Sequence, residues 1–271
     1  MKIAKTTIFL AVSLSLGLAF ELYRHYYDIN IPLFELINGF AWNNDGFWQT
    51  VTFLGDGAVA FSLLIFFVRR YPSIFWQGFL ISLALGVVVQ LAKHLCFVSR
   101  PASVLGPEHI HIIGAVLRHY SFPSGHSLTA FAMAALLMHH LAASWRYGFL
   151  LLASLIACSR VVVGAHWPVD IVVGALIGWH GARWVLCVSE SVNWKYATWG
   201  YEQRLGVGFM HVLWLVVALS LWFDKGSYPQ AAWLARSLTL CGFLFWLTQY
   251  LRLPKALVEP KAENKPAGIN G

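Results

Sequence analysis

Charged residues are scarce in this chain, and their scarcity excludes an ordinary soluble domain. Asp, Glu, Lys and Arg make up only 11% of the 271 residues, whereas soluble proteins contain about 25%. Hydrophobic residues make up 58%, and they occur in blocks of about 17–22 residues, the length that crosses a hydrocarbon core of about 30 Å. The composition therefore predicts an all-α fold, a polytopic integral membrane helix bundle.

The chain also lacks a cysteine framework and a basic patch. Its four cysteines show neither the spacing of a zinc site nor that of a disulfide-rich domain. The net charge of +7 does not indicate a nucleic-acid partner, because the basic residues are spread along the chain at the ends of apolar segments. A membrane topology explains their distribution better.

The apolar blocks predict about eight membrane-spanning helices. They lie near residues 6–23, 51–68, 74–94, 124–141, 148–163, 168–188, 206–223 and 231–250. We expect residues 1–205 to form a six-helix core, residues 206–250 to add two helices, and the polar residues 251–271 to be a disordered cytoplasmic tail. The first block resembles a secretory signal, but its cleavage pattern is poor, so we favour an uncleaved helix.

The distribution of Lys and Arg predicts how the helices are oriented. With the N-terminus in the cytoplasm, most of these residues lie inside, as the positive-inside rule requires. Lys93, Ser124, Arg160 and Asp170, each near the end of a different predicted helix, then all lie at the outer face. Ionisable residues retained beside membrane helices indicate a functional site.

Three segments of this region suit a phosphate group. Their patterns are Lys-x6-Arg-Pro at residues 93–101, Pro-Ser-Gly-His at residues 123–126, and Ser-Arg-x5-His-x3-Asp at residues 159–170. Lys93 supplies a point charge, and the guanidinium groups of Arg100 and Arg160 make bidentate contacts with phosphate oxygens. The alternative for each of the three, taken singly, is ordinary anchoring of a long side chain at the lipid headgroups.

The second and third patterns add a helix start and a histidine–carboxylate pair. Ser124 can simply cap a helix, but free N–H groups at a helix start also bind anions, and Gly125 lets the backbone approach closely. His166 and Asp170 lie one helical turn apart, so the carboxylate can hold one imidazole nitrogen. A self-satisfied polar pair or a metal site are the alternatives, and no His-Glu-x-x-His arrangement supports the metal.

Together the three spacings resemble the signature of the type-2 phosphatidate phosphatase superfamily, which includes the bacterial haloperoxidases that hold vanadate. The resemblance covers about residues 51–188 and leaves out the last two predicted helices. It implies that His166 is a nucleophile that forms a phosphohistidine, that Asp170 orients it, and that His126 is the general acid and then the base. It also implies that phosphate is bound, without metal or cofactor, by Lys93, Arg100, Ser124, Gly125 and Arg160.

Two further polar residues lie near the expected site. Asp56, between two glycines near the outer end of the second predicted helix, either assists the site or merely caps the helix. Arg118 lies in the loop of roughly 20 residues between the first two patterns, and loops of that length are often functional. It is a candidate contact for a second phosphate.

These expectations describe a membrane lipid phosphatase in the bacterial inner membrane, with its active site facing the periplasm. Undecaprenyl pyrophosphate is the favoured substrate. Phosphatidylglycerophosphate, phosphatidate, the phosphates of lipid A and a lipid phosphotransferase reaction are the alternatives, because all share the first half-reaction. A lipid transporter or scramblase is a different class, which the clustering of charge on one face and the lack of an inverted repeat disfavour.

Overall fold

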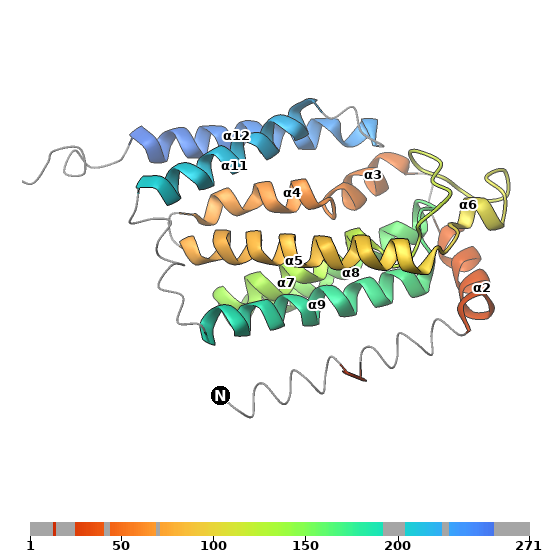
Figure 1. Cartoon of the computed structure of the whole chain (residues 1–271). Coiled ribbons are helices and arrows are strands. Elements are labelled where there is room, and N and C mark those ends of the chain that lie inside the picture. The colour runs from red at the N-terminus through yellow and green to blue at the C-terminus, as the bar shows by residue number, and fades with distance from the viewer. Residues whose placement is uncertain are drawn as a thin grey trace, which may run out of the picture.

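A computed structural model describes residues 13–14, 25–40, 44–68, 71–191, 204–223 and 228–251. Within these ranges the chain forms helices and no strands, which confirms the all-α prediction. The centre of the bundle consists of α5 (Pro72–Cys96), α7 (Gly125–His140), α8 (Arg146–Val162) and α9 (Pro168–Ser191). The pair α11 (Arg204–Phe223) and α12 (Ala232–Leu251) lies along one side of it (Figure 1).

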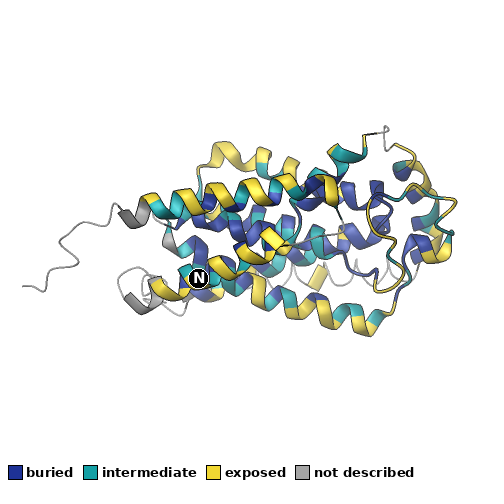
Figure 2. Cartoon of the chain, turned by 90° about the horizontal axis from the view of Figure 1, so that it is seen from above, coloured by how far each residue is buried: buried dark blue, intermediate teal, exposed yellow. Residues whose placement is uncertain are grey.

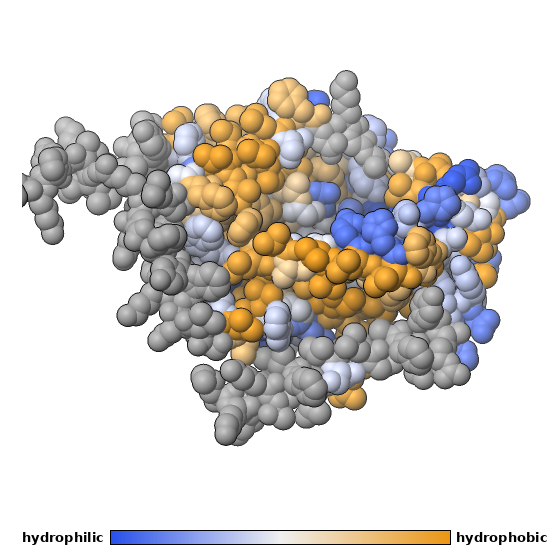
Figure 3. Space-filling model, viewed as in Figure 1, coloured by the Kyte–Doolittle hydropathy of each residue, from blue (hydrophilic) through white to orange (hydrophobic). Residues whose placement is uncertain are grey.

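The described helices have the length and surface of a multi-pass membrane protein. Four segments are long and apolar enough to cross a membrane, namely Ser73–Val104, Ala143–Val162, Pro168–Glu190 and Pro229–Thr248. Exposed residues cover the outward sides of the helices (Figure 2), and hydrophobic residues dominate that surface, whereas hydrophilic ones gather toward the end that carries α6 (Pro101–Val104) (Figure 3). The predicted total of eight spans stays a prediction, and the expected first span lies outside the described residues.

The predicted single helix at residues 51–68 is wrong, because the chain breaks there into two pieces. α3 (Asp45–Phe53) is followed by a turn, then by α4 (Gly57–Ser62) and the 3-10 helix η1 (Leu63–Phe67), and the two parts are bent by 60°. Asp56 starts the second part, since its carboxylate accepts the backbone N–H groups of Ala58 and Val59 at 2.8 and 3.3 Å.

The segment between the first two predicted spans, which lacks a long apolar run, contains the helix α2 (Tyr26–Asn38). It lies across one end of the bundle (Figure 1) and buries Phe34 together with two asparagines. Asn30 accepts the backbone N–H of Val169 at 2.8 Å, and the Asn38 amide donates to the Val162 carbonyl at 2.9 Å. These buried amide contacts fix α2 against the start of α9 and the end of α8.

α7 and α9 approach each other closely through a Gly-x-x-x-Gly pattern. A Cβ atom at Gly174 would lie 2.5 Å from the Ser124 carbonyl oxygen, and one at Gly178 would overlap the Leu128 carbonyl. Small residues of this kind let membrane helices pack backbone against backbone. The result is a direct bond between the two helix starts, in which the Ser124 N–H donates to the Asp170 carbonyl at 3.1 Å.

Candidate active site

The three sequence patterns expected to bind phosphate meet at one end of the bundle, as the spacing of the predicted helices requires. Lys93 lies in the last turn of α5, and Arg100 immediately precedes α6. Ser124 caps α7, whose first residue is Gly125, and His126 follows. Arg160 lies in the last turn of α8, and Asp170 in the first turn of α9, with His166 just before it. Five separate elements therefore supply the site.

His166 and Asp170 form a buried pair with a defined tautomer. The His166 Nδ1 lies 3.3 Å from the Asp170 Oδ2, and the two residues are 2% and 0% exposed. The other ring nitrogen, Nε2, lies 3.3 Å from the Arg100 Nη1. Because a guanidinium group has only donors, Nε2 must be the unprotonated nitrogen, and Nδ1 carries the proton that Asp170 accepts.

The surroundings of His166 also keep its ring neutral. Burial is the first cause, and the charges of Arg100, Arg160 and Lys93 act in the same direction, so the pKa of His166 lies well below its ordinary value. A neutral imidazole with a free Nε2 lone pair is the form that can attack phosphorus.

Asp170 is held by three further donors besides His166. The Tyr26 hydroxyl donates to Oδ1 at 2.6 Å, while the Ser121 hydroxyl and the Trp167 N–H donate to Oδ2 at 2.5 and 3.0 Å. Burial and then the charge of Asp170 raise the pKa of Tyr26, so its hydroxyl stays protonated and remains a donor. The carboxyl group is thus fully buried and fixed in orientation behind His166.

Arg100 is fixed by the loop between the first two patterns. Its Nε donates to the His119 carbonyl at 2.8 Å, Nη1 to the Ala165 carbonyl at 2.8 Å, and Nη2 to the Tyr120 carbonyl at 3.3 Å. Tyr120 has a φ of 57°, a left-handed conformation that is uncommon outside glycine. These carbonyl contacts hold the guanidinium beside His166 without neutralising its charge.

Arg160 brings a second buried guanidinium, only 2% exposed. Its Nη1 donates to the Thr52 hydroxyl at 2.5 Å and to the Tyr228 hydroxyl at 2.6 Å. Among the described residues its Nε has no hydrogen-bond partner. A buried donor without a partner is costly, and an anion bound here would satisfy it.

Ser124 combines the two uses considered for it. It caps α7 by accepting the Ser127 backbone N–H at 3.4 Å, and it also accepts the Ser127 hydroxyl at 3.1 Å. Its own hydroxyl proton is not donated to any described residue. The start of α7, a helix of 16 residues, thus presents backbone N–H groups and a hydroxyl at the site, an arrangement that attracts anions.

Lys93 and His126 line a cavity of about 400 Å³ that runs away from the site between the helices. Gly55, Asp56 and Gly125 line the same end. Apart from Gln90 and Thr129, the remainder of the lining is apolar or small and comes from α4, α5, α7 and Val217 of α11. Its members on α5 are Gly78, Ile81, Ser82, Leu85, Gly86, Val89 and Gln90. We refer to this cavity as the apolar groove. It opens at the charged site, and its apolar lining suits a hydrocarbon chain.

The two less certain residues differ in position. Asp56 caps α4, and it also lines the polar end of the apolar groove. It therefore occupies a position that fits both alternatives, a helix cap and a residue beside the site. Arg118 has an exposed side chain. Its carbonyl oxygen accepts the Arg100 N–H at 3.0 Å and the Ser103 hydroxyl at 2.7 Å. Its role in binding a second phosphate stays a prediction.

Four residues that contact the site were missed in the sequence, namely Tyr26, Thr52, Ser121 and Tyr228. No local pattern marks them, since each acts on a motif residue far away along the chain, as Tyr26 does on Asp170 at a separation of 144 residues. One usable signal was present, because the Gly-x-x-x-Gly pattern of Gly174 and Gly178 indicates where α9 packs closely. Among the described residues, no three His, Cys, Asp or Glu side chains are grouped as metal ligands.

Comparisons with known proteins agree on one family. Residues 74–194, which contain all three patterns, match the model of the PAP2 superfamily. The chain is 31% identical over 191 residues to YbjG of Escherichia coli K12, a protein named as an undecaprenyl-diphosphatase, and this alignment covers 66% of the chain and 89% of YbjG. It is also 31% identical over 117 residues to an undecaprenyl-diphosphatase of Sulfolobus acidocaldarius, covering 43% of the chain and 52% of that relative.

A solved structure shows the same architecture. The crystal structure of Aquifex aeolicus LpxE superimposes with a TM-score of 0.55 at 33% identity. The superposition covers 59% of this chain and 95% of LpxE. The part of the chain without a counterpart therefore amounts to a sizeable addition to a shared core.

Proposed function

Because the chain belongs to the PAP2 superfamily and is a membrane lipid phosphatase, we propose that it converts undecaprenyl pyrophosphate to undecaprenyl phosphate through a phosphohistidine. The proposal places the reaction at the outer face of the bacterial inner membrane. The named activity of YbjG supports the substrate, and the positive-inside rule supports the orientation.

The observation that carries the proposal is the arrangement around His166. Its Nε2 lone pair lies beside Arg100, its Nδ1–H is held by Asp170, and the site adjoins the apolar groove. In the first step Nε2 forms a bond to the terminal phosphorus, and the bond from that phosphorus to the bridging oxygen breaks. The negative charge of the bound diphosphate offsets the nearby cations, so His126 is protonated in the substrate complex and gives its proton to that oxygen, and undecaprenyl phosphate leaves.

The second step returns the site to its starting state. His126, now neutral, takes a proton from water, the water oxygen bonds to phosphorus, and the bond from phosphorus to Nε2 breaks, which releases inorganic phosphate. Throughout both steps the Nδ1 proton stays with His166. Asp170 offsets the positive charge that the ring acquires while it carries the phosphoryl group.

Charge on the transferring phosphoryl group is balanced by groups that stand ready before substrate binds. Arg100 is oriented by three backbone carbonyls, and the Arg160 Nε has no partner among the described residues. The Gly125 N–H and the Ser124 hydroxyl add donors from the start of α7. Donors fixed in advance around developing charge are the largest contribution to many enzymatic rate enhancements.

The apolar groove supports a long-chain lipid as the substrate. Lys93 and Gly78, which line its two ends on α5, are separated by about 22 Å at the helical rise of about 1.5 Å per residue. That length takes the first part of a polyprenyl chain, whose remainder stays in the bilayer. A soluble phosphate ester would not need such a channel.

The experiment is phosphate release by the purified chain in detergent with undecaprenyl pyrophosphate, phosphatidylglycerophosphate, phosphatidate and lipid A, in the presence of EDTA. We expect the diphosphate to have the highest kcat/KM and His166→Ala to abolish turnover, while His109→Ala, at an exposed histidine in the loop, retains it. Preference for a monophosphate would refute the substrate. Turnover by the His166→Ala variant would refute the covalent mechanism.

A further inference from the structure

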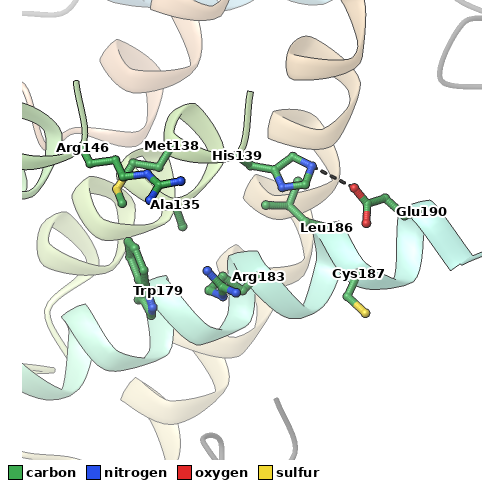
Figure 4. Close-up of a pocket in the computed structure, with 9 residues that line it drawn as sticks. All are labelled: Ala135, Met138, His139, Arg146, Trp179, Arg183, Leu186, Cys187 and Glu190. Carbon is green, nitrogen blue, oxygen red and sulfur yellow. Dashed lines mark ion pairs between the residues drawn. The ribbon is translucent and has the colours of Figure 1, made fainter. Parts of the chain in front are cut away.

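A second cavity lies between α7, α8 and α9 at the end of the bundle opposite the active site. Its volume is about 450 Å³ (Figure 4). It is lined by Ala135, Met138, His139, Arg146, Trp179, Arg183, Leu186, Cys187 and Glu190. His139 lies in the last turn of α7, whereas the active site lies at its first turn, so about 20 Å separates the two places along the helix axis. The proposed reaction uses none of these residues.

Positive charge in this cavity is not balanced within the described part of the chain. Its one carboxylate, Glu190, is paired with His139, whose Nε2 lies 2.9 Å from the Glu190 Oε1 (Figure 4). Neither Arg146 nor Arg183 forms an ion pair with a described residue. Two guanidinium groups on adjacent helices thus face one cavity, which suits an anion with several oxygens.

Trp179 holds one of these guanidinium groups in place. The Arg183 guanidinium carbon lies 5.9 Å from the centre of the Trp179 ring, within the range of a cation–π contact. Such a contact uses none of the guanidinium's hydrogen-bond donors on another acceptor group, so they remain available to an anion. Figure 4 shows Arg146 reaching from the start of α8 toward the side of α9 that carries Trp179.

The rest of the lining is apolar, and this favours a lipid over a free anion as the ligand of the cavity. Ala135, Met138 and Leu186 contribute hydrocarbon surface next to the two arginines. The apolar segment of α9 ends at Glu190, and α8 begins at Arg146, so the cavity lies where the hydrocarbon of the far leaflet meets its phosphate groups. Basic pockets between membrane helices at this level bind lipid headgroups.

We propose that this cavity binds the phosphate of an anionic phospholipid from the leaflet opposite the active site. Arg146 and Arg183 contact the phosphate oxygens, Trp179 fixes Arg183, and the glycerol and the first part of the acyl chains lie against Ala135, Met138 and Leu186. The site is separate from the phosphatase reaction, and the proposal stands whether or not undecaprenyl pyrophosphate is the substrate.

The test measures binding of phosphatidylglycerol to the full-length protein in an uncharged detergent by native mass spectrometry. Phosphatidylglycerol is a phosphodiester, so a monoester or diphosphate phosphatase does not consume it. We expect the double variant Arg146→Gln, Arg183→Gln to lose about tenfold or more in its affinity for one phosphatidylglycerol molecule, since two charged contacts are lost. Arg236→Gln, a matched loss of an exposed arginine on α12, should leave binding unchanged.

Phosphate release measured on the same samples reports folding independently, and it should be unchanged in the double variant. If the double variant is inactive, each single variant carries the test and should lose part of the binding. Equal binding by wild type and variants, or an equal loss in Arg236→Gln, would overturn the proposal. If inorganic phosphate binds to the wild type but not to the variants, while the substitutions leave phosphatidylglycerol binding unchanged, then the cavity takes a free anion. That result would overturn the lipid assignment.

Discussion

The closeness of Arg100 to His166 predicts how activity depends on pH. His166 acts as its neutral form, so kcat/KM falls as the pH drops through the pKa of His166 in the free enzyme. Burial and the neighbouring cations hold that pKa well below its ordinary value, so the wild type keeps its activity below the ordinary histidine pKa of about 6.5. Arg100→Gln removes one of those cations, and the acid limb should therefore move to higher pH.

The distance gives the size of the shift. A full charge 3.3 Å from the His166 Nε2 is worth about 5 kcal/mol at an effective dielectric constant of about 20, so its removal strongly favours the protonated ring. Water that enters the space left by the shorter glutamine hydrates the charged form of the ring and acts in the same direction, so we expect the acid limb to move up by at least about 1 pH unit. The level of kcat/KM should fall as well, since we propose that Arg100 also binds the phosphate.

The assay is the pH profile of kcat/KM with a soluble aryl phosphate, for the wild type, Arg100→Gln and the control Arg118→Gln. Ionisation of the substrate is common to all three profiles and cancels in the comparison. An acid limb that stays in place while activity drops would mean that Arg100 acts on phosphate alone. A shift to lower pH would show that the titrating group is not a histidine beside this cation.

Three further predictions follow from individual contacts. Tyr26→Phe removes a 2.6 Å hydrogen bond to Asp170 and should lower kcat about tenfold with little change in KM, whereas Tyr27→Phe should not. Gly178→Ala would drive a Cβ into the Leu128 carbonyl and should cost about 1–3 kcal/mol of stability, seen as a lower midpoint of thermal unfolding than for Gly148→Ala, whose Cβ meets nothing within 4 Å. Arg118→Ala should lower kcat/KM for diphosphate lipids by about tenfold to a hundredfold and leave monophosphate lipids unchanged; equal losses would remove its role at a second phosphate.

The long helices could be predicted because each is a continuous apolar block. Residues 74–94 and 168–188 were expected to be helical, and the structure has Pro72–Cys96 and Pro168–Ser191 there. α2 was not predicted, because a helix of 13 residues with only one buried face contains no apolar block as long as those used to predict the other helices. The break before α4 was missed for a different reason, since Asp56 lies inside an otherwise apolar segment and was interpreted as a site residue or as the cap of a helix end, not as a break within the helix.

Some residues of the candidate site could be predicted from local sequence patterns, whereas others depend on contacts between distant parts of the chain. His166 and Asp170 lie 3.3 Å apart, as one helical turn requires, and the motif residues reach one end of the bundle because alternate helices run in opposite directions. The donors that hold Asp170 and Arg160 depend on tertiary packing, which periodicity does not contain. Thr52 shows this clearly, since it lies in a helix whose path was predicted wrongly and 108 residues from Arg160.

The C-terminal segment lies beyond the region that matches the superfamily, and yet it reaches the site at two points. Tyr228 accepts a hydrogen bond of 2.6 Å from Arg160, and Val217 of α11 lines the apolar groove. In the proposed reaction, the first contact sets which edge of the Arg160 guanidinium faces the phosphate, and the second narrows the channel offered to the hydrocarbon chain. Since the matched residues 74–194 hold all of the groups proposed to make and break bonds to phosphorus, this added segment is positioned to act on what the site accepts and not on the reaction itself.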